Sequence, residues 1–453
     1  MIRSFRCRWT MACWVLLIGL FVAVPQARSA EPAIVVVAAS PAIRGLEPDR
    51  GHRHVGLATL ADGRVLALYT VGYAQHCNLL GPCSQQSEVW HLVFDHRGLV
   101  VRPARTWPEL DGKAGLNSGS ILAGKGSPDP DAHSAFFGLA HSSHNAGGGY
   151  FVRIDGSGQV VGRGGGEGSY PGRNVCVLGE NLATPAMWVD PITHGYLWYE
   201  RGVKLTATVN LGGYGYNYYG VWEMFCGASA ALRSDFALLV RKEPRSHVGF
   251  SLYRAPGKQW KVVGNEVRLP VSSLPSSKYL ASGGVAVGDD RGVVLYRDSV
   301  PTDGRQNLYF ARFRITPTGV VLVDHLPRQM PASLTTEGLD GSVLYGGKGV
   351  FHIALYQAGN SAAGQALNRR QVLRFYGMDF ESGRLTEIAA PYEDQNWSGK
   401  PPIDYYANNP NEDSFSMARS CDGNLYVGGA IDGGKGPTVL KIFRIPVGSP
   451  TCR

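Results

Sequence analysis

Glycine-closed turns recur between apolar, β-rich runs along this sequence, and their spacing is the feature that most constrains the fold. Seven glycines close such turns, with successive gaps of 60, 54, 45, 62, 64 and 65 residues: Gly98, Gly158, Gly212, Gly257, Gly319, Gly383 and Gly448. A second series of turns precedes them and feeds further apolar runs, at Gly63, Asp131, Gly195, Asp235, Gly292, Gly349 and Gly423. Two hairpins in each unit correspond to one four-stranded antiparallel blade. The repeat therefore predicts an all-β, seven-bladed β-propeller.

Composition agrees with this fold class and excludes long helices. The chain holds 59 glycines and 27 prolines among 453 residues. In helix interiors a glycine costs about 1 kcal/mol and a proline about 3 kcal/mol relative to alanine, so short strands are favoured. The seventh unit offers only three strand-like runs, whereas the apolar run at 33–38 has no partner nearby in sequence. We predict that this N-terminal strand completes the last blade and closes the ring.

The first thirty residues have the pattern of a secretory signal peptide. Three arginines precede an apolar stretch from Met11 to Val24, and small residues at Ser29 and Ala30 offer a cleavage site. This stretch is shorter than the roughly 18 residues that a membrane span needs, and no other segment is long and apolar enough. We expect residues 1–30 to be removed and 31–453 to form a single domain that is secreted or periplasmic.

Removal of this segment changes the charge and the cysteine count. The formal net charge falls from +8 to +4, because the segment carries four arginines and no acid. No block of Lys or Arg indicates a nucleic-acid partner. Six cysteines remain, an even number typical of disulfides in exported proteins. Their places in the repeat favour pairing Cys77 with Cys83, Cys176 with Cys226, and Cys421 with Cys452, the last clamping the ring closure. No cysteine and histidine spacing indicates a metal site, and no cofactor is expected.

Histidine, arginine and tyrosine gather at one face of the predicted propeller, which receives the start of each first strand and the end of each second strand. These residues are His52, His54 and His76 in the first unit, His141 and His144 in the second, Tyr199 and Arg201 in the third, Arg241 in the fourth, and Tyr279 and Arg297 in the fifth. Binding residues of propellers concentrate in the loops over one end of the channel, so this face is the predicted site.

The stretch from His52 to Tyr69, followed by His76, resembles BNR-type propellers that include ulvan lyases and related uronate-cleaving polysaccharide lyases. Two histidines flank one hairpin in those enzymes, and His54 and His76 are 22 residues apart here. The stretch ending in Tyr199-Glu200-Arg201 is similar to a family segment that carries an arginine. The resemblance implies a histidine and a tyrosine as base and acid, and an arginine on the uronate carboxylate. His141 and His144 are an alternative counterpart of the histidine pair.

The chemistry of a lyase reaction agrees with the types of residue at this face. Cleavage of a uronate linkage by β-elimination needs a base near neutral pKa for the C5 proton and a cation for the enolate-like carboxylate. Neutral histidine suits the first task, and Arg201 or Arg241 the second. His52, His141, His144, Arg241, Tyr279 and Arg297 are then expected to bind substrate.

We expect an exported, monomeric, carbohydrate-active enzyme that acts on an acidic polysaccharide. The alternatives are a non-catalytic propeller that binds glycan or protein through the same face, and a glycoside hydrolase. A hydrolase needs paired carboxylates, for which Glu200, Glu337 and Asp340 are available.

Overall fold

A computed structural model of the chain describes the strands and many of the tight turns. The residues described are 32–38, 52–72, 87–95, 97–106, 120–128, 134–142, 148–167, 169–171, 176–178, 181–189, 192–200, 204–213, 222–226, 236–243, 247–254, 261–270, 282–297, 308–331, 334–361, 369–394, 415–432 and 438–449, with side chains for part of them. All the regular elements in these ranges are β-strands. The expected all-β fold class is confirmed.

The strands form seven antiparallel sheets, which we number in chain order. Sheet 1 contains β2 (His52–Thr59), β3 (Val65–Gly72), β4 (Ser87–Phe94) and β5 (Val100–Thr106), and sheet 2 contains β6 (Ser120–Pro128), β7 (Ser134–Ser142), β8 (Gly148–Asp155) and β9 (Val160–Glu167). Sheet 3 contains β10 (Ser169–Pro171), β11 (Cys176–Leu178), β12 (Asn181–Val189), β13 (Ile192–Glu200) and β14 (Lys204–Gly213). Sheet 4 contains β15 (Trp222–Cys226), β16 (Phe236–Glu243), β17 (His247–Arg254) and β18 (Lys261–Pro270).

The remaining three sheets lie in the C-terminal half, and one of them includes the first strand of the chain. Sheet 5 contains β19 (Ser282–Gly288), β20 (Arg291–Arg297), β21 (Leu308–Thr316), β22 (Gly319–Leu322) and β23 (Arg328–Gln329). Sheet 6 contains β24 (Leu334–Gly347), β25 (Val350–Ser361), β26 (Arg369–Asp379), β27 (Leu385–Glu387) and β28 (Tyr392–Asp394). Sheet 7 contains β29 (Phe415–Arg419), β30 (Asn424–Asp432), β31 (Thr438–Pro446) and β1 (Ala33–Ala38).

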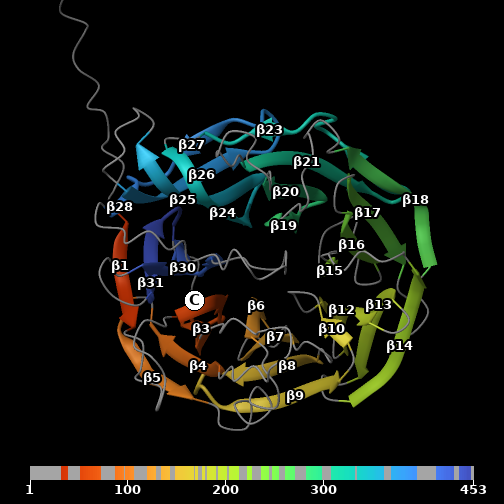
Figure 1. The fold of residues 1–453 in the computed structure, drawn as a ribbon, viewed down its shortest axis with the longest axis horizontal. Helices are drawn as coiled ribbons and strands as arrows, with labels where there is room; N and C mark the ends of the chain where they lie inside the picture. The colour runs from red at the N-terminus through yellow and green to blue at the C-terminus, as the bar shows by residue number, and fades with distance from the viewer. Residues whose placement is uncertain are drawn as a thin grey trace, which may run out of the picture.

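The sheets lie side by side around a common centre (Figure 1). Each sheet contacts the next one along the chain, through β2 with β6, β8 with β10, β11 with β15, β18 with β22, β19 with β24, and β24 with β29. Sheet 7 in turn contacts sheet 1, because β2 packs against β29 and β30. The first strand of a sheet lies toward the centre and its last strand toward the outside.

The N-terminal strand pairs with the last strand of the chain, as the sequence predicts. β1 runs antiparallel to β31, with Ile34 opposite Phe443 and Val37 opposite Lys441. The neighbouring sheet approaches this strand closely, since a Cβ built on Gly98 would lie 2.5 Å from Cβ of Val35. Gly98 also has φ of +81°, so glycine suits this turn both for its backbone conformation and for the space available.

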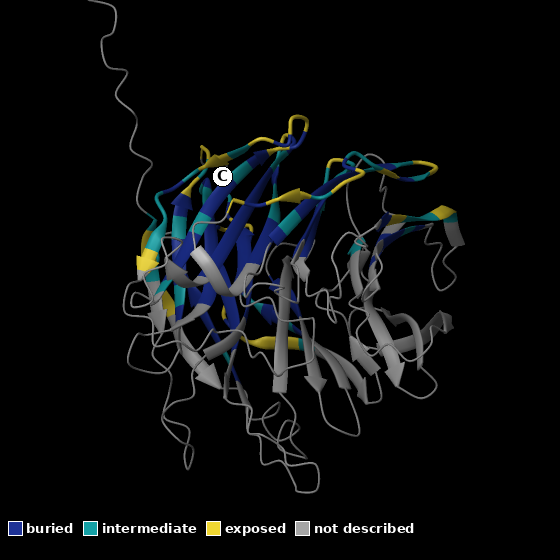
Figure 2. Cartoon of the chain, turned by 45° about the horizontal axis from the view of Figure 1, so that its top comes forward, coloured by how far each residue is buried: buried dark blue, intermediate teal, exposed yellow. Residues whose placement is uncertain are grey.

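The core consists of apolar layers between neighbouring sheets. Strand β3 shows how one strand serves two layers, because successive residues of a strand point to opposite faces. Leu66 and Leu68 pack toward sheet 2, whereas Val65, Ala67 and Tyr69 pack toward sheet 7. Each of the leucine and valine side chains, once fully buried, contributes about 1.5–3 kcal/mol. Figure 2 shows that this buried zone extends along the strands up to exposed turns at one edge.

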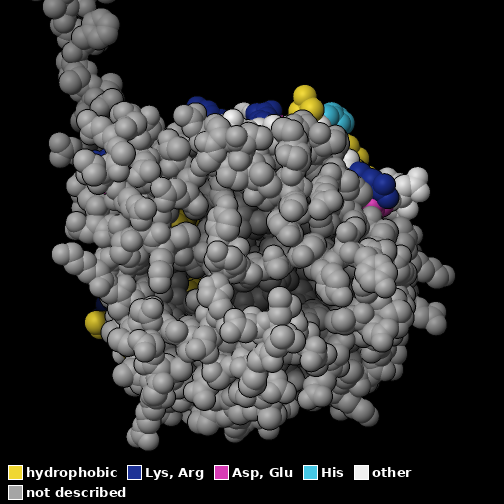
Figure 3. Space-filling model, viewed as in Figure 1, with side chains coloured by type: hydrophobic (Ala, Val, Ile, Leu, Met, Phe, Trp, Pro, Cys, Tyr) yellow, Lys and Arg dark blue, Asp and Glu magenta, His cyan; other side chains and the backbone are white. Residues whose placement is uncertain are grey.

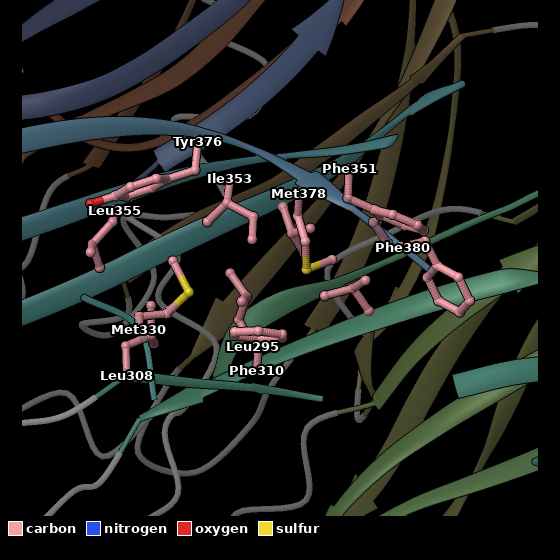
Figure 4. Packing of buried hydrophobic residues seen from close by; sticks show 13 residues of the cluster. Leu295, Leu308, Phe310, Met330, Phe351, Ile353, Leu355, Tyr376, Met378 and Phe380 are labelled. Atoms are coloured by element: carbon pink, nitrogen blue, oxygen red, sulfur yellow. The ribbon is translucent and has the colours of Figure 1, made fainter. Parts of the chain in front are cut away.

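The layer between sheets 5 and 6 is the largest cluster of buried residues (Figure 4). Phe351 packs against Phe380 with ring centroids 5.9 Å apart, and Met330 fills the space beside Leu308. His352, in the second strand of sheet 6, is also buried and 5% exposed. These layers explain why the sheets do not need helices to cover them.

Aspartate side chains close several hairpins through hydrogen bonds to the turn backbone. Asp95 Oδ1 accepts from the backbone N–H of Arg97 and Leu99, each at 2.9 Å. Asp155 Oδ1 accepts likewise from Ser157 at 2.8 Å, and Asp379 Oδ1 from Ser382 at 2.8 Å. The turns predicted around Gly98, Gly158 and Gly383 are therefore confirmed, with an Asx-type hydrogen bond as the local cause.

The third unit differs from the sequence prediction. Gly195 was expected in a turn, but it lies inside β13 opposite Ala186 and Asn210. Gly212 was also expected in a turn and lies near the end of β14. The described strands of this sheet end and begin instead at Leu178 and Asn181, at Val189 and Ile192, and at Glu200 and Lys204. The sequence signal was Asp190-Pro191, which outweighs the isolated glycines as a turn marker.

Candidate functional site

The circle of sheets has two ends with different chemistry. One end carries the turns that join first to second strands and third to fourth strands, and we call it the turn end. Hydrogen bonds link these turns across sheets: Ser420 Oγ donates to the carbonyl of Gly63 at 3.3 Å, and the Tyr345 hydroxyl donates to Asp289. Because the strands are antiparallel, first strands begin and second strands finish at the opposite end, which we call the loop end.

Five of the predicted site residues lie in strand positions that meet at the loop end. His52 and His54 lie at the beginning of β2, and His141 lies next to the last residue of β7. Arg241 is opposite Trp222 in the second strand of sheet 4, and Arg297 is the last residue of β20. The strand order thus brings histidines from sheets 1 and 2 and arginines from sheets 4 and 5 to one end of the fold.

A β-bulge singles out His54. Its neighbours Arg53 and Val55 pair with Thr70 and Tyr69, which are adjacent residues, so His54 is the extra residue in β2. Bulges change the direction of a side chain and are frequent next to active sites. Among the described residues, this is the strongest local feature at any predicted site position.

A second β-bulge at the loop end lies at Glu337. The sequence identifies this residue only as one of three carboxylates that a hydrolase could use. Thr336 pairs with Gly359 and Gly338 with Ala358, so Glu337 is the extra residue in β24. Nearby in the same sheet, Gln357 is fully buried, and the Tyr356 hydroxyl donates to the amide oxygen of Gln371 at 3.1 Å. A β-bulge has no reliable signature in the sequence. The sequence alone therefore gave no reason to favour Glu337 over the other carboxylates.

The strand order contradicts the expected position of Tyr199. This residue lies near the end of β13, which is the third strand of sheet 3, whereas the repeat predicts it at the end of a second strand. Third strands finish at the turn end, so Tyr199 is separated from His54 by the height of the sheets. Glu200, the last residue of the same strand, shares this position. The cause is the one-strand shift in the third unit described above.

Four further site residues, His76, His144, Arg201 and Tyr279, lie outside the described residues. Cys77, Cys83 and Cys452 also lie outside them. Cys421 is disulfide-bonded, and its pairing with Cys452 stays a prediction. Cys176 and Cys226 lie within β11 and β15, two neighbouring first strands that contact each other. Their pairing also stays a prediction.

Within the described part of the chain, no group of three or more His, Cys, Asp or Glu side chains is arranged to hold a metal ion. The same residues contain no helix with the length and apolarity to span a bilayer.

No known family model matches this sequence, and no curated protein matches it. Three solved structures illustrate its similarity to known folds. An oligogalacturonate lyase in complex with manganese is 11% identical, with 92% of this chain and 97% of that chain covered and a TM-score of 0.46. An ulvan lyase bound to GlcA(1-4)Rha3S is 9% identical, with 89% and 96% covered and a TM-score of 0.44. The NanB sialidase from Streptococcus pneumoniae is 10% identical, with 92% and 71% covered and a TM-score of 0.44.

Proposed function

We propose that the chain is an exported seven-bladed β-propeller, closed by β1, whose loop end binds an acidic polysaccharide and cleaves it by β-elimination. What supports the proposal is that His54, at a bulge in β2, and His141, Arg241 and Arg297 all lie in the parts of their strands nearest the loop end. The seven sheets, their closed circle of contacts and the pairing of β1 with β31 support the blade count.

The reaction divides between two kinds of residue. Arg241 or Arg297 pairs with the uronate carboxylate and lowers the energy of the enolate-like state that follows loss of the C5 proton. The neutral form of His54 or His141 accepts that proton as the base. The C4–O bond then breaks, the electron pair leaves with the departing oxygen, and a C4–C5 double bond remains. Protonation of that oxygen completes the step, and a histidine or Glu337 can supply the proton.

The assay is absorbance near 235 nm during incubation of the protein with uronate polysaccharides, because the unsaturated uronate absorbs there. We expect His54→Ala or His141→Ala to lower the rate about 10²–10⁴-fold, which is the usual contribution of a general base. Tyr199→Phe is expected to retain the rate, because the residue lies at the turn end. A matched control is Arg97→Gln, since Arg97 is exposed at the turn end.

Other outcomes separate the alternatives. New reducing ends without absorbance at 235 nm indicate a hydrolase and exclude the elimination. Binding of the polysaccharide without any new ends indicates a non-catalytic propeller. Loss of activity in Tyr199→Phe, with full activity in His54→Ala, would overturn the assignment of the site to the loop end.

A further inference from the structure

Two arginines at the turn end share a single carboxylate from the neighbouring sheet. Arg291 donates from Nε and Nη2 to Oε1 of Glu381, at 3.2 and 3.0 Å. Arg314 donates from Nη2 to the other oxygen, Oε2, at 2.5 Å. The two arginines lie directly opposite each other on β20 and β21. Together they form a fork that holds both oxygens of one oxyanion, and we call it the arginine fork.

The fork is built in advance of any ligand. Both guanidinium groups lie over the ring of Phe380, with Cζ of Arg291 5.7 Å and Cζ of Arg314 5.1 Å from its centroid. Phe380 is fully buried, so this platform is rigid. Stacking on an aromatic face and cross-strand pairing both limit the rotamers of long side chains, which reduces the entropy lost when an anion binds.

The Glu381 side chain is not what holds its own turn in place. The backbone carbonyls of Phe380 and Glu381 accept hydrogen bonds from Nη1 of Arg312, at 2.5 and 2.8 Å. Asp379 closes the same turn through Ser382. The Glu381 side chain is 58% exposed, so solvent reaches the carboxylate in the fork. An exposed pair of this kind is weak, and an external anion can compete for it.

Charge favours such competition. The two arginines face one carboxylate, which leaves the filled fork with an excess of positive charge, and hydrogen bonds from Arg314 and Arg291 keep the pKa of Glu381 below its ordinary value. Asp289, two residues before Arg291, accepts from the Tyr345 hydroxyl, while its carbonyl accepts from Nη1 of Arg291 at 3.3 Å. Figure 3 shows Lys and Arg side chains at a few points on the edge of the molecule.

We propose that the arginine fork is a second anion-binding site, which takes a carboxylate or sulfate group of a polyanionic glycan in place of Glu381. Glu381 then acts as an internal competitor that lowers the affinity of the fork. The site lies at the turn end, away from the histidines at the loop end, so it does not depend on the reaction proposed above. Its effect would be to hold the protein on a polymer while other segments of that polymer reach the loop end.

The test measures binding of polygalacturonate, dextran sulfate and neutral dextran by affinity electrophoresis of the mature chain. We expect Glu381→Gln to lower the Kd for at least one polyanion by about two- to fivefold, as removal of a weak exposed competitor permits. The double variant Arg291→Gln/Arg314→Gln is expected to raise the Kd for that polyanion. The binding of neutral dextran is expected to stay the same in every variant. Tighter binding of polygalacturonate alone identifies a carboxylate as the ligand, and tighter binding of dextran sulfate alone identifies a sulfate.

The matched control is Glu387→Gln, because Glu387 pairs at 2.5 Å with one arginine, Arg374, in the same sheet and has 39% of its side chain exposed. It should leave all Kd values unchanged. Thermal unfolding of each variant shows whether the double arginine variant still folds, and Glu381→Gln tests the proposal without it. An unchanged Kd in Glu381→Gln, or an equal change in Glu387→Gln, would overturn the proposal whether or not the chain cleaves polysaccharide.

Discussion

Replacing Asp324 by asparagine removes the charge that balances a buried arginine between sheets 5 and 6. The Arg312 side chain is 4% exposed, and so is that of Asp324. Arg312 donates from Nε to Oδ2 and from Nη2 to Oδ1, both at 2.7 Å, and its backbone N–H donates to Oδ2 at 3.0 Å. This is a bidentate pair with nearly all its donors used, and breaking one such buried pair costs about 3–5 kcal/mol.

We therefore expect Asp324→Asn to lower the free energy of unfolding by about 3–5 kcal/mol at pH 7, measured by urea unfolding of the mature chain. The control is Arg328→Gln. Arg328 also contacts Asp324, at 3.1 Å, but its side chain is 46% exposed, so the expected loss is about 0–1 kcal/mol. A loss below about 1 kcal/mol in Asp324→Asn, or equal losses in the two variants, would refute the reasoning from burial.

The pH dependence gives a second measure of the same pair. Burial alone would raise the pKa of Asp324, but hydrogen bonds and charge from Arg312, together with Arg328, hold it below its ordinary value of 3.8. A lowered pKa in the folded state stabilises the protein above the ordinary value, and this contribution disappears as pH falls through the folded-state pKa. The difference between wild type and Asp324→Asn should therefore shrink in strong acid.

Three other substitutions test the packing and the closure. Burial, with the charge of Arg419, lowers the pKa of His352 to about 4, so wild-type stability should fall between pH 6.5 and 4, where only the unfolded state gains the proton. His352→Gln should flatten that part of a plot of unfolding free energy against pH. Gly292→Ala places a Cβ 2.0 Å from Cζ of Phe313, and we expect a loss of about 1–3 kcal/mol in urea unfolding. Cys421→Ser removes a disulfide and should lower the free energy of unfolding, measured in urea without reductant, by about 2–5 kcal/mol.

Local sequence chemistry was sufficient for much of the fold. The hairpins at Asp95, Asp155 and Asp379 were predictable because an aspartate and a glycine a few residues apart determine a turn whatever surrounds it. The pairing of β1 with β31 was predictable because one unit lacked a strand and one apolar run lacked a partner. The third unit was not predictable from glycines alone, since Gly195 and Gly212 lie within strands.

In the candidate site, too, the sequence could predict some features and not others. Positions at the beginning of a first strand or the end of a second strand, such as His54 and His141, follow once the repeats are in register. Tyr199 was placed wrongly because the third unit was assigned one strand out of step. Such a shift moves a residue to the opposite end of the fold. The bulges that mark His54 and Glu337 depend on how two strands pair, which no single strand's sequence specifies.

By itself the sequence determined the all-β class of the fold and several of its hairpin turns, because these depend on interactions within a few residues. The tertiary structure decided which charged groups meet. Arg291 reaches Glu381 across 90 residues of sequence, and Arg312 reaches the carbonyl of Phe380 across 68. Such contacts arise where two sheets pack face to face, so they depend on the relative position of whole sheets and have no local signal in the chain.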